Sequence, residues 1–227
     1  MSCTLVFARA KHVHNKTITL LHIEADPLWC GLVEAVASVL PRVIRFLPAR
    51  NGTQGLALAR SQRPDIVLLD LQLPDLDGFA LSRQLAGLPM PAQTVLLSGR
   101  TDDVALHLAS QPHIAGLLWK TADAPRFLPE ALSAVAEGRK YFTPAVSAAL
   151  CRFRADPVAY YKILSDRELE LIPYFGHALA DGEIAARLSI NLFTVRSHRQ
   201  RIMQKLGVHR GIDLIHWAIR TGLVPPI

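Results

Sequence analysis

The sequence predicts two folded parts, an open parallel α/β sheet within residues 17–140 and an all-helical unit within residues 164–227. In the first part, five short β-prone runs alternate with five helical stretches, a pattern typical of a parallel sheet covered by helices. In the second part, four short helical stretches follow one another with no strand between them. A Pro-containing stretch lies between the two patterns, so we expect a linker at residues 141–163.

Strands of the first part are expected where a short apolar run ends in polar or turn residues. They lie at residues 17–23, 43–47, 65–70, 93–97 and 114–119. The run that closes with Asp70 is apolar over residues 66–69, as expected of a parallel strand buried on both faces.

Helices are expected after each of these strands. They lie at residues 28–40, 51–61, 79–88, 102–110 and 124–137. Pro27 suits the first turn of the first helix, where a backbone N–H has no helical partner. Asn51 can cap the second helix with its side-chain oxygen.

Polar side chains follow the C-terminal ends of four predicted strands. Glu24 and Asp26 follow the first strand, Asp70 the third, Ser98 the fourth and Lys120 the fifth. Ligands bind at this edge of an open parallel sheet. The sequence therefore predicts that a functional site lies there.

The linker and the helical unit have clear start signals. Residues 141–154 predict a turn and then a helix from Thr143 or Pro144, followed by a Pro-containing junction. The four helices of the unit are expected to start at residues 165, 181, 191 and 212, the first through a capping box of Ser165 and Glu168. Pro173 lies inside the first of them and predicts a kink or an early end near Gly176.

The third helix of the unit is strongly basic. Residues 194–206 contain no acid, no Gly and no Pro. Val195, Ile202 and Leu206 fall on one side of a helix, and Arg and Gln side chains fall on the other. Such donors suit base edges and phosphates. The alternative interpretation is a solvated basic helix on the surface.

Composition limits the class of protein. The 227 residues carry a formal net charge of +6, and residues 194–210 hold Arg and Lys with no acid, which favours a polyanionic partner for this part. Cys3, Cys30 and Cys151 are widely spaced and form no metal-binding pair, as expected of reduced thiols in a cytosolic protein. No apolar run approaches the roughly 18 residues of a membrane span. Residues 1–16 are expected to extend outside the core.

Motifs in both parts resemble one family. The second part contains Leu-Ser-Asp-Arg-Glu, Glu-Ile-Ala-Ala-Arg-Leu, Thr-Val-Arg-Ser-His and Ile-Met-Gln-Lys-Leu-Gly-Val in order. The first part contains Asp-Ile-Val-Leu-Leu-Asp ending at Asp70, then Pro74, Gly78, Ser98 and Lys120. The chain thus resembles response regulators of the NarL/FixJ (LuxR-type) class of bacterial two-component systems. The resemblance implies a flavodoxin-like receiver with a five-stranded parallel sheet and a four-helix LuxR-type helix-turn-helix domain.

The resemblance implies a chemistry for the polar edge of the sheet. Asp70 is the expected phosphoacceptor, and Ser98 and Lys120 are expected to bind the phosphoryl group. The expected ligands of Mg²⁺ are Glu24, Asp26, Asp70 and Gln72. Ala25 departs from the family, which has a second carboxylate at this position.

Several of these residues also have simpler roles. Asp26 either reaches the metal or caps the helix that follows. Ser98 either binds the phosphoryl group or caps the turn after its strand. The aromatic switch position of the family holds Leu117, and Trp119 lies two residues later on the same strand face.

The resemblance also implies partners. We expect double-stranded DNA, a sensor histidine kinase and a second copy of the chain, paired through the helix at residues 212–221. The expected DNA-contacting residues lie on the basic helix: Thr194, Arg196, Ser197, His198, Arg199, Gln200, Arg201 and Lys205. Thr194, His198, Arg199 and Lys205 are expected either to contact phosphates or to pack within the unit.

Other functions are less well supported. A receiver that works without phosphorylation, through protein–protein contacts, is the main alternative. No Gly-rich phosphate loop, HExxH or GxSxG motif occurs, so the sequence does not predict an enzyme.

Overall fold

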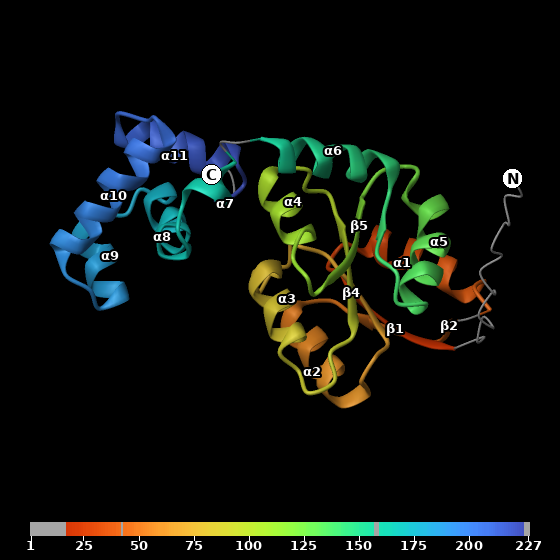
Figure 1. The fold of residues 1–227 in the computed structure, drawn as a ribbon. Helices are drawn as coiled ribbons and strands as arrows, with labels where there is room; N and C mark the ends of the chain where they lie inside the picture. The colour runs from red at the N-terminus through yellow and green to blue at the C-terminus, as the bar shows by residue number, and fades with distance from the viewer. Residues whose placement is uncertain (1–16, 42, 157–158, 225–227) are drawn as a thin grey trace, which may run out of the picture.

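A parallel sheet forms the centre of the first part in the computed structural model, which describes residues 17–41, 43–156 and 159–224. Its strand order is β2-β1-β3-β4-β5-β6, and all neighbours are parallel (Figure 1). The strands are β1 (Ile18–Ile23), β2 (Val43–Ala49), β3 (Ile66–Leu69), β4 (Gln93–Ser98), β5 (Ile114–Trp119) and β6 (Tyr141–Phe142). The five predicted strands are all present.

The sixth strand corrects the prediction, which placed a turn at residues 141–142. Tyr141 pairs with Gly116 and Phe142 with Leu117 of β5. A Cβ atom on Gly116 would lie 2.4 Å from the Tyr141 carbonyl oxygen, so the approach requires glycine. A two-residue strand leaves no periodic pattern, and its pairing depends on a glycine far away in the sequence.

Five helices cover the two faces of the sheet. They are α1 (Pro27–Ser38), α2 (Gly52–Gln62), α3 (Gly78–Ala86), α4 (Asp103–Ala109) and α5 (Ala124–Ala136). Figure 1 shows α1 and α5 on one side of the sheet and α2, α3 and α4 on the other. Four of these helices start at an Asp or Asn whose side chain accepts a backbone N–H: Asp26, Asn51, Asp77 and Asp102.

The core has two layers because successive strand residues point to opposite faces. Leu20 and Leu68 pack with α1 and α5 in one layer. Leu21 and Leu69 pack with α2, α3 and α4 in the other. Strands buried on both faces are near-continuous apolar runs, as predicted for the run ending at Asp70.

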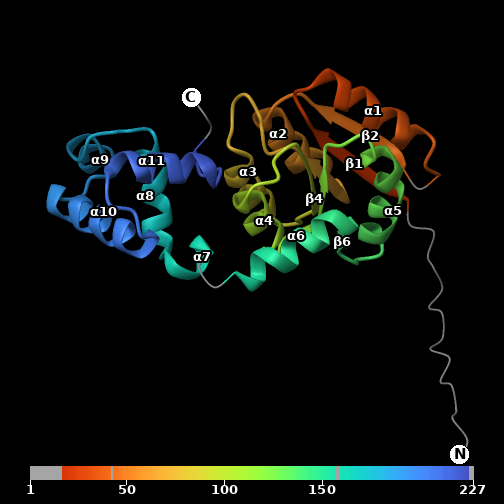
Figure 2. The same cartoon turned by 90° about the horizontal axis from the view of Figure 1, so that it is seen from above.

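The linker contains more structure than predicted. Helix α6 (Pro144–Ala155) is capped by Thr143, as expected. The junction adds a short helix, α7 (Tyr160–Ile163). Tyr160 is buried, and its ring centroid lies 5.8 Å from that of His107 on α4 and 6.2 Å from that of Trp217. In Figure 2, α6 runs along the sheet part and α7 leads into the helical unit.

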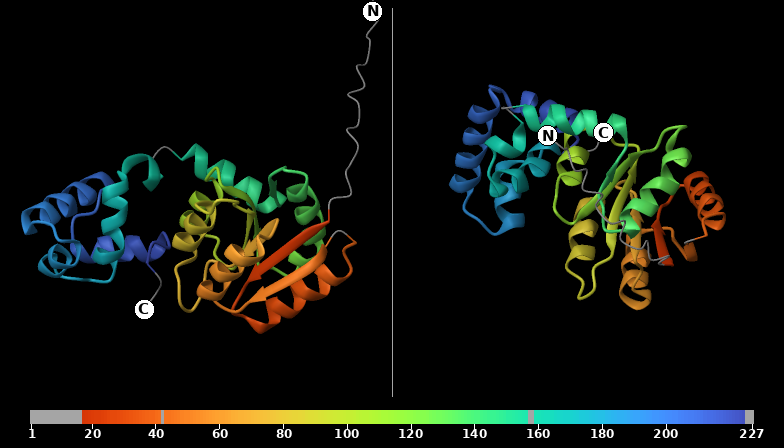
Figure 3. Two further views of the ribbon diagram at one scale, coloured as in Figure 1. Left: turned by 90° about the horizontal axis from the view of Figure 1, so that it is seen from below. Right: turned by 45° about the vertical axis from the view of Figure 1, so that its right-hand side comes forward.

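The helical unit has the four predicted helices: α8 (Asp166–Gly176), α9 (Asp181–Leu188), α10 (Leu192–Leu206) and α11 (Gly211–Arg220) (Figure 3). The capping box of Ser165 and Glu168 starts α8. Helix α8 contains Pro173 and ends at Gly176, as predicted. Two residues later, Ala178 adopts a left-handed backbone with φ 56°.

Candidate functional site

Three polar side chains meet at the C-terminal edge of the sheet. Glu24 follows β1, Asp70 follows β3 and Lys120 follows β5. The Lys120 ammonium lies 2.8 Å from Asp70 Oδ2 and 2.6 Å from Glu24 Oε2. Both carboxylates are buried. The structure therefore brings together Glu24, Asp70 and Lys120, as the positions past the strand ends predicted.

The remaining oxygen of Asp70 is the chemically open atom of this cluster. Asp70 Oδ1 is buried and has no hydrogen-bond partner among the described residues. Burial raises the pKa of Glu24, and the neighbouring Asp70 charge adds to this, while the Lys120 ammonium and the Asp26 N–H counteract it. Burying a carboxylate oxygen without a partner costs free energy, so this oxygen is well placed to bind a cation or to react with an electrophile.

Asp26 lies outside this cluster. Its side chain is exposed, and its Oδ1 accepts the Leu28 N–H at 2.8 Å as the N-cap of α1. Its own N–H donates to Glu24 Oε1 at 2.9 Å. No group of three His, Cys, Asp or Glu side chains suited to a metal occurs in the described part of the chain. The geometry matches the capping role, because Pro27 starts the helix immediately afterwards.

Ser98 and Gln72 border the cluster. The buried Ser98 hydroxyl accepts the Arg100 N–H at 3.2 Å, which is the turn-capping role. Gln72 is exposed and forms an isolated antiparallel bridge with Asp77. Arg100 was not predicted: its guanidinium bonds to Asp102 and also to the carbonyl oxygen of Gly222 in the helical unit. Nothing in the sequence near Arg100 signals a partner so distant.

Side chains at the end of β5 follow the predicted alternation. Leu117 is fully buried, and Trp119 packs against the same core layer. The Trp119 indole N–H is buried without a partner among the described residues. Lys120 lies 5.8 Å from the ring centroid of Trp29 in α1, a contact that the sequence did not predict.

Helix α10 has one docked face and one open face. Val195 and Ile202 are buried, as predicted. The open face carries exposed side chains at Thr194, Arg196, Gln200, Arg201 and Lys205, and half-buried ones at Ser197, His198 and Arg199. His198 Nδ1 is buried without a partner in the described chain.

Two cations of α10 are used inside the unit. Arg199 Nη2 lies 2.6 Å from Asp181 Oδ1, and its guanidinium stacks 4.3 Å from the ring centroid of Phe175. Lys205 Nζ lies 2.7 Å from Glu168 Oε2. These contacts match the packing alternative for both residues.

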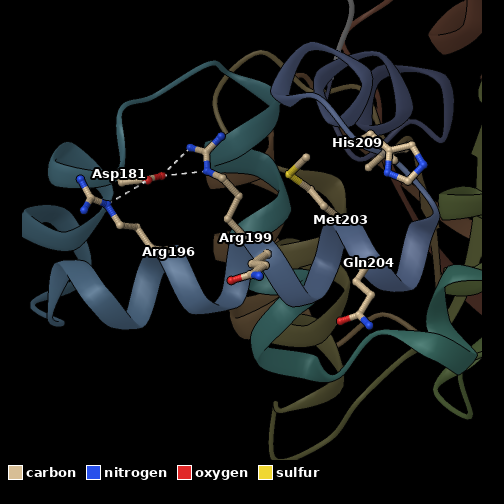
Figure 4. A pocket seen from close by; sticks show the side chains of 8 residues that line it. Asp181, Arg196, Arg199, Met203, Gln204 and His209 are labelled. Carbon is tan, nitrogen blue, oxygen red and sulfur yellow. Dashed lines mark hydrogen bonds and ion pairs between the residues drawn. The ribbon is translucent and has the colours of Figure 1, made fainter.

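A hollow lies along the side of α10 (Figure 4). Its lining residues come from α9, α10 and the segment before α11: Asp181, Arg196, Arg199, Gln200, Met203, Gln204, Val208 and His209. Arg196 Nε lies 3.8 Å from Asp181 Oδ2, so the acid faces both arginines (Figure 4). The sequence marked Asp181 only as a helix start.

Two protein families match the chain. Residues 21–132 match the response regulator receiver domain, and residues 162–218 match the bacterial regulatory proteins of the luxR family. Response regulator UvrY of Escherichia coli is 28% identical over 178 residues, which cover 77% of this chain and 81% of UvrY. A NarL transcriptional regulatory protein of Mycobacterium tuberculosis is 30% identical over 179 residues, which cover 78% of this chain and 82% of that protein.

Solved structures share the fold. RcsB from Salmonella enterica serovar Typhimurium, solved bound to a promoter with a phosphomimetic, has a TM-score of 0.61 at 22% identity over 89% of this chain and 98% of RcsB. ChrA, a response regulator of a heme-sensing two-component system, has a TM-score of 0.51 at 28% identity over 89% of this chain and 96% of ChrA. None of the described helices is long and apolar enough to cross a membrane.

Proposed function

We infer that this chain, which belongs to the NarL/FixJ family of response regulators, regulates transcription by binding DNA through α10 under the control of its receiver domain. Both family matches lie in the expected order, the receiver first and the LuxR-type domain second. We assign residues 17–140 to the receiver, 141–163 to the linker and 164–227 to the DNA-binding domain. We also propose that the protein works in the cytoplasm, where its DNA is.

Asp70 is the proposed phosphoacceptor. The observation that supports this role is the unpaired, buried Oδ1 of Asp70 beside a carboxylate oxygen that Lys120 holds. In the proposed step, this oxygen attacks the phosphorus of a kinase phosphohistidine, and the P–N bond breaks as the P–O bond forms. Lys120 offsets negative charge on the phosphoryl oxygens, and the Ser98 hydroxyl, whose oxygen accepts the Arg100 N–H, donates its own hydrogen to one of them.

The residues present fit Mg²⁺, with one carboxylate fewer than the family has. Glu24 and Asp70 supply buried carboxylates, and the main chain at Gln72 is the proposed third protein ligand. Mg²⁺ usually keeps several waters and uses one or two carboxylates together with phosphate oxygens, so two carboxylates suffice. Bound there, the ion supplies positive charge that offsets the crowded oxygens. Asp26, occupied as a helix cap, is the weakest of the four candidate ligands.

Phosphorylation is tested by incubating the full chain with acetyl phosphate and Mg²⁺ and measuring its mass. We expect a gain of one phosphoryl group in the wild type and none in Asp70→Asn. The main alternative is a receiver that acts without phosphorylation, and it is favoured because no group of three His, Cys, Asp or Glu side chains in the described part of the chain is suited to a metal ion. No mass gain in either protein, and identical DNA binding by both, would establish that alternative.

DNA binding is proposed to use the open face of α10. Arg196 is suited to a guanine edge and Gln200 to an adenine edge. Thr194, Ser197, His198 and Arg201 are proposed to contact nearby phosphates or sugars. Arg199 and Lys205 have a supporting role, since their cations are paired within the domain.

A second copy of the chain is the proposed partner for DNA binding. One small helix-turn-helix unit makes few base contacts, and a two-fold pair doubles them. Helix α11 is the proposed pairing element, and its Ile212 residue is 47% exposed. The chain is proposed to act as a phosphorylation-controlled binding protein and not as an enzyme. A gel mobility-shift assay with duplex DNA, repeated at increasing salt, tests the binding.

A further inference from the structure

We propose that Asp181 is a specificity-determining residue of the DNA-reading surface, which acts by positioning Arg196 and Arg199. This inference rests on the proposed binding of DNA through α10. An acid on a surface that meets phosphates weakens binding to any DNA. Its presence there therefore needs a role that offsets this cost.

The first observation is the position of the carboxylate between two guanidinium groups of α10. Asp181 Oδ1 lies 2.6 Å from Arg199 Nη2 and 2.8 Å from Arg199 Nε. Asp181 Oδ2 lies 3.8 Å from Arg196 Nε. The side chain of Asp181 is 22% exposed and that of Arg196 is 60% exposed. The carboxylate is thus largely buried, while the side chain of Arg196 is exposed to solvent.

Arg199 makes this arrangement rigid. Its guanidinium bonds to Asp181, donates to the Leu179 carbonyl oxygen at 3.4 Å and stacks on the Phe175 ring. Phe175 is fully buried in the core of the unit. Because Arg199 is held from several sides, it holds the Asp181 carboxylate at a defined place beside Arg196.

The carboxylate attracts Arg196 but forms no direct hydrogen bond with it. At 3.8 Å the pair is longer than a charge-assisted hydrogen bond, so Arg196 can leave it for a base edge. An unrestrained arginine would pair with any phosphate that comes near. The carboxylate repels phosphates at this place and keeps the guanidinium turned toward the start of α9 (Figure 4). A residue of this kind lowers affinity for all DNA and raises the preference for one sequence.

The chain offers a matched control on the same helix. Glu183 lies two residues further along α9 and is exposed. Its Oε2 accepts the Ala180 N–H at 2.8 Å, a cap that glutamine can also form. Glu183→Gln therefore removes one negative charge from the first turn of α9 without touching Arg196 or Arg199.

The experiment uses the full chain with beryllofluoride and Mg²⁺ present throughout. A preferred duplex is first selected by the wild type from a library of random sequences. Dissociation constants are then measured for that duplex and for a scrambled duplex of the same composition. For Asp181→Asn we expect about fivefold tighter binding to the scrambled duplex at 0.15 M salt, with a salt slope steeper by about 0.9, the effect of one phosphate contact.

The preference for the selected duplex should fall by about the same factor in Asp181→Asn, and it should stay unchanged in Glu183→Gln. Asp181→Glu, which keeps a carboxylate, should retain most of the preference even if its fold is less stable. An unchanged preference in Asp181→Asn would overturn this inference and leave the proposed function standing. Equal losses of preference in Asp181→Asn and Glu183→Gln would do the same. A wild type that selects no sequence and binds no duplex would overturn the proposed function as well.

Discussion

The Lys205 ammonium lies 2.7 Å from Glu168 Oε2, so the basic helix α10 is tied to the start of α8. Glu168 is 3% exposed, and the same oxygen accepts the Ser165 N–H at 2.7 Å. Burial acts to raise the pKa of Glu168, but the bonds from Lys205 and Ser165 outweigh it and lower the pKa. Lys205 of the DNA-facing helix therefore stabilises the fold of the domain.

Lys205→Met should destabilise the DNA-binding domain by about 1.5 kcal/mol, because it leaves the buried Glu168 carboxylate without its cation, while the partly exposed Lys205 side chain lets solvent screen the pair. Adding Glu168→Gln should recover most of this loss, since glutamine keeps an oxygen for the Ser165 N–H. Urea unfolding of the full chain, followed by circular dichroism, measures both changes. A double variant no more stable than Lys205→Met would contradict the pairing.

The stabilisation by this pair should also depend on pH. The pKa of Glu168 is lower in the folded state than its ordinary value of 4.5. The contribution is therefore complete above about pH 4.5 and lost as the pH falls through the lowered value. Urea unfolding at a series of pH values should show a loss in the wild type that Glu168→Gln lacks.

Ala25→Asp should strengthen Mg²⁺ binding about tenfold, because affinity for a hard cation rises with the number of carboxylates. Tryptophan emission is a suitable signal, since the ring centroid of Trp29 lies 5.8 Å from Lys120. Ala25→Asn, of the same size without the charge, is the control. Asp26→Asn should leave Mg²⁺ affinity unchanged because asparagine also caps helices. A large loss of affinity in Asp26→Asn would show that Asp26 reaches the ion.

The features that the sequence predicted are those encoded by residues close together in the chain. The helix starts at Asn51 and Ser165 were predicted because a cap needs only residues within one turn. The Asp70 edge of the sheet followed from apolar runs that end in polar residues. The bonds of Arg199 to Asp181 were not predictable, since 18 residues separate the two. Strand β6 was missed for the same reason, because it depends on a distant glycine.

His22 should make the receiver less stable in acid. It is 1% exposed, and neither ring nitrogen has a partner among the described residues. Burial, together with the nearby Lys120 and Arg50 charges, lowers the pKa of His22 from 6.5 to about 3. The unfolded state therefore binds an extra proton between these values, and stability falls as the pH drops from 6.5, by about 1.4 kcal/mol per pH unit from this group.

His22→Leu should remove this part of the pH dependence and stabilise the receiver at pH 5. Leucine fills a similar volume, and Leu68, which pairs with residue 22 across the sheet, is apolar. Urea unfolding of the two proteins at pH 5 and pH 7.5 isolates the contribution of His22, since all other titratable groups are the same in both proteins. Equal differences between the proteins at the two pH values would rule out a buried neutral histidine.

Ala178→Gly should stabilise the DNA-binding domain by about 1 kcal/mol. Ala178 has φ 56°, where a Cβ atom is strained and glycine is not. Its N–H donates to the Phe175 carbonyl oxygen and the Leu179 N–H to that of Tyr174, so the turn is held by bonds that glycine keeps. Ala186→Gly on the exposed side of α9 is the control and should destabilise by about the same amount. If the midpoint of thermal unfolding moves in the same direction for both variants, the left-handed backbone at Ala178 carries no strain that glycine relieves.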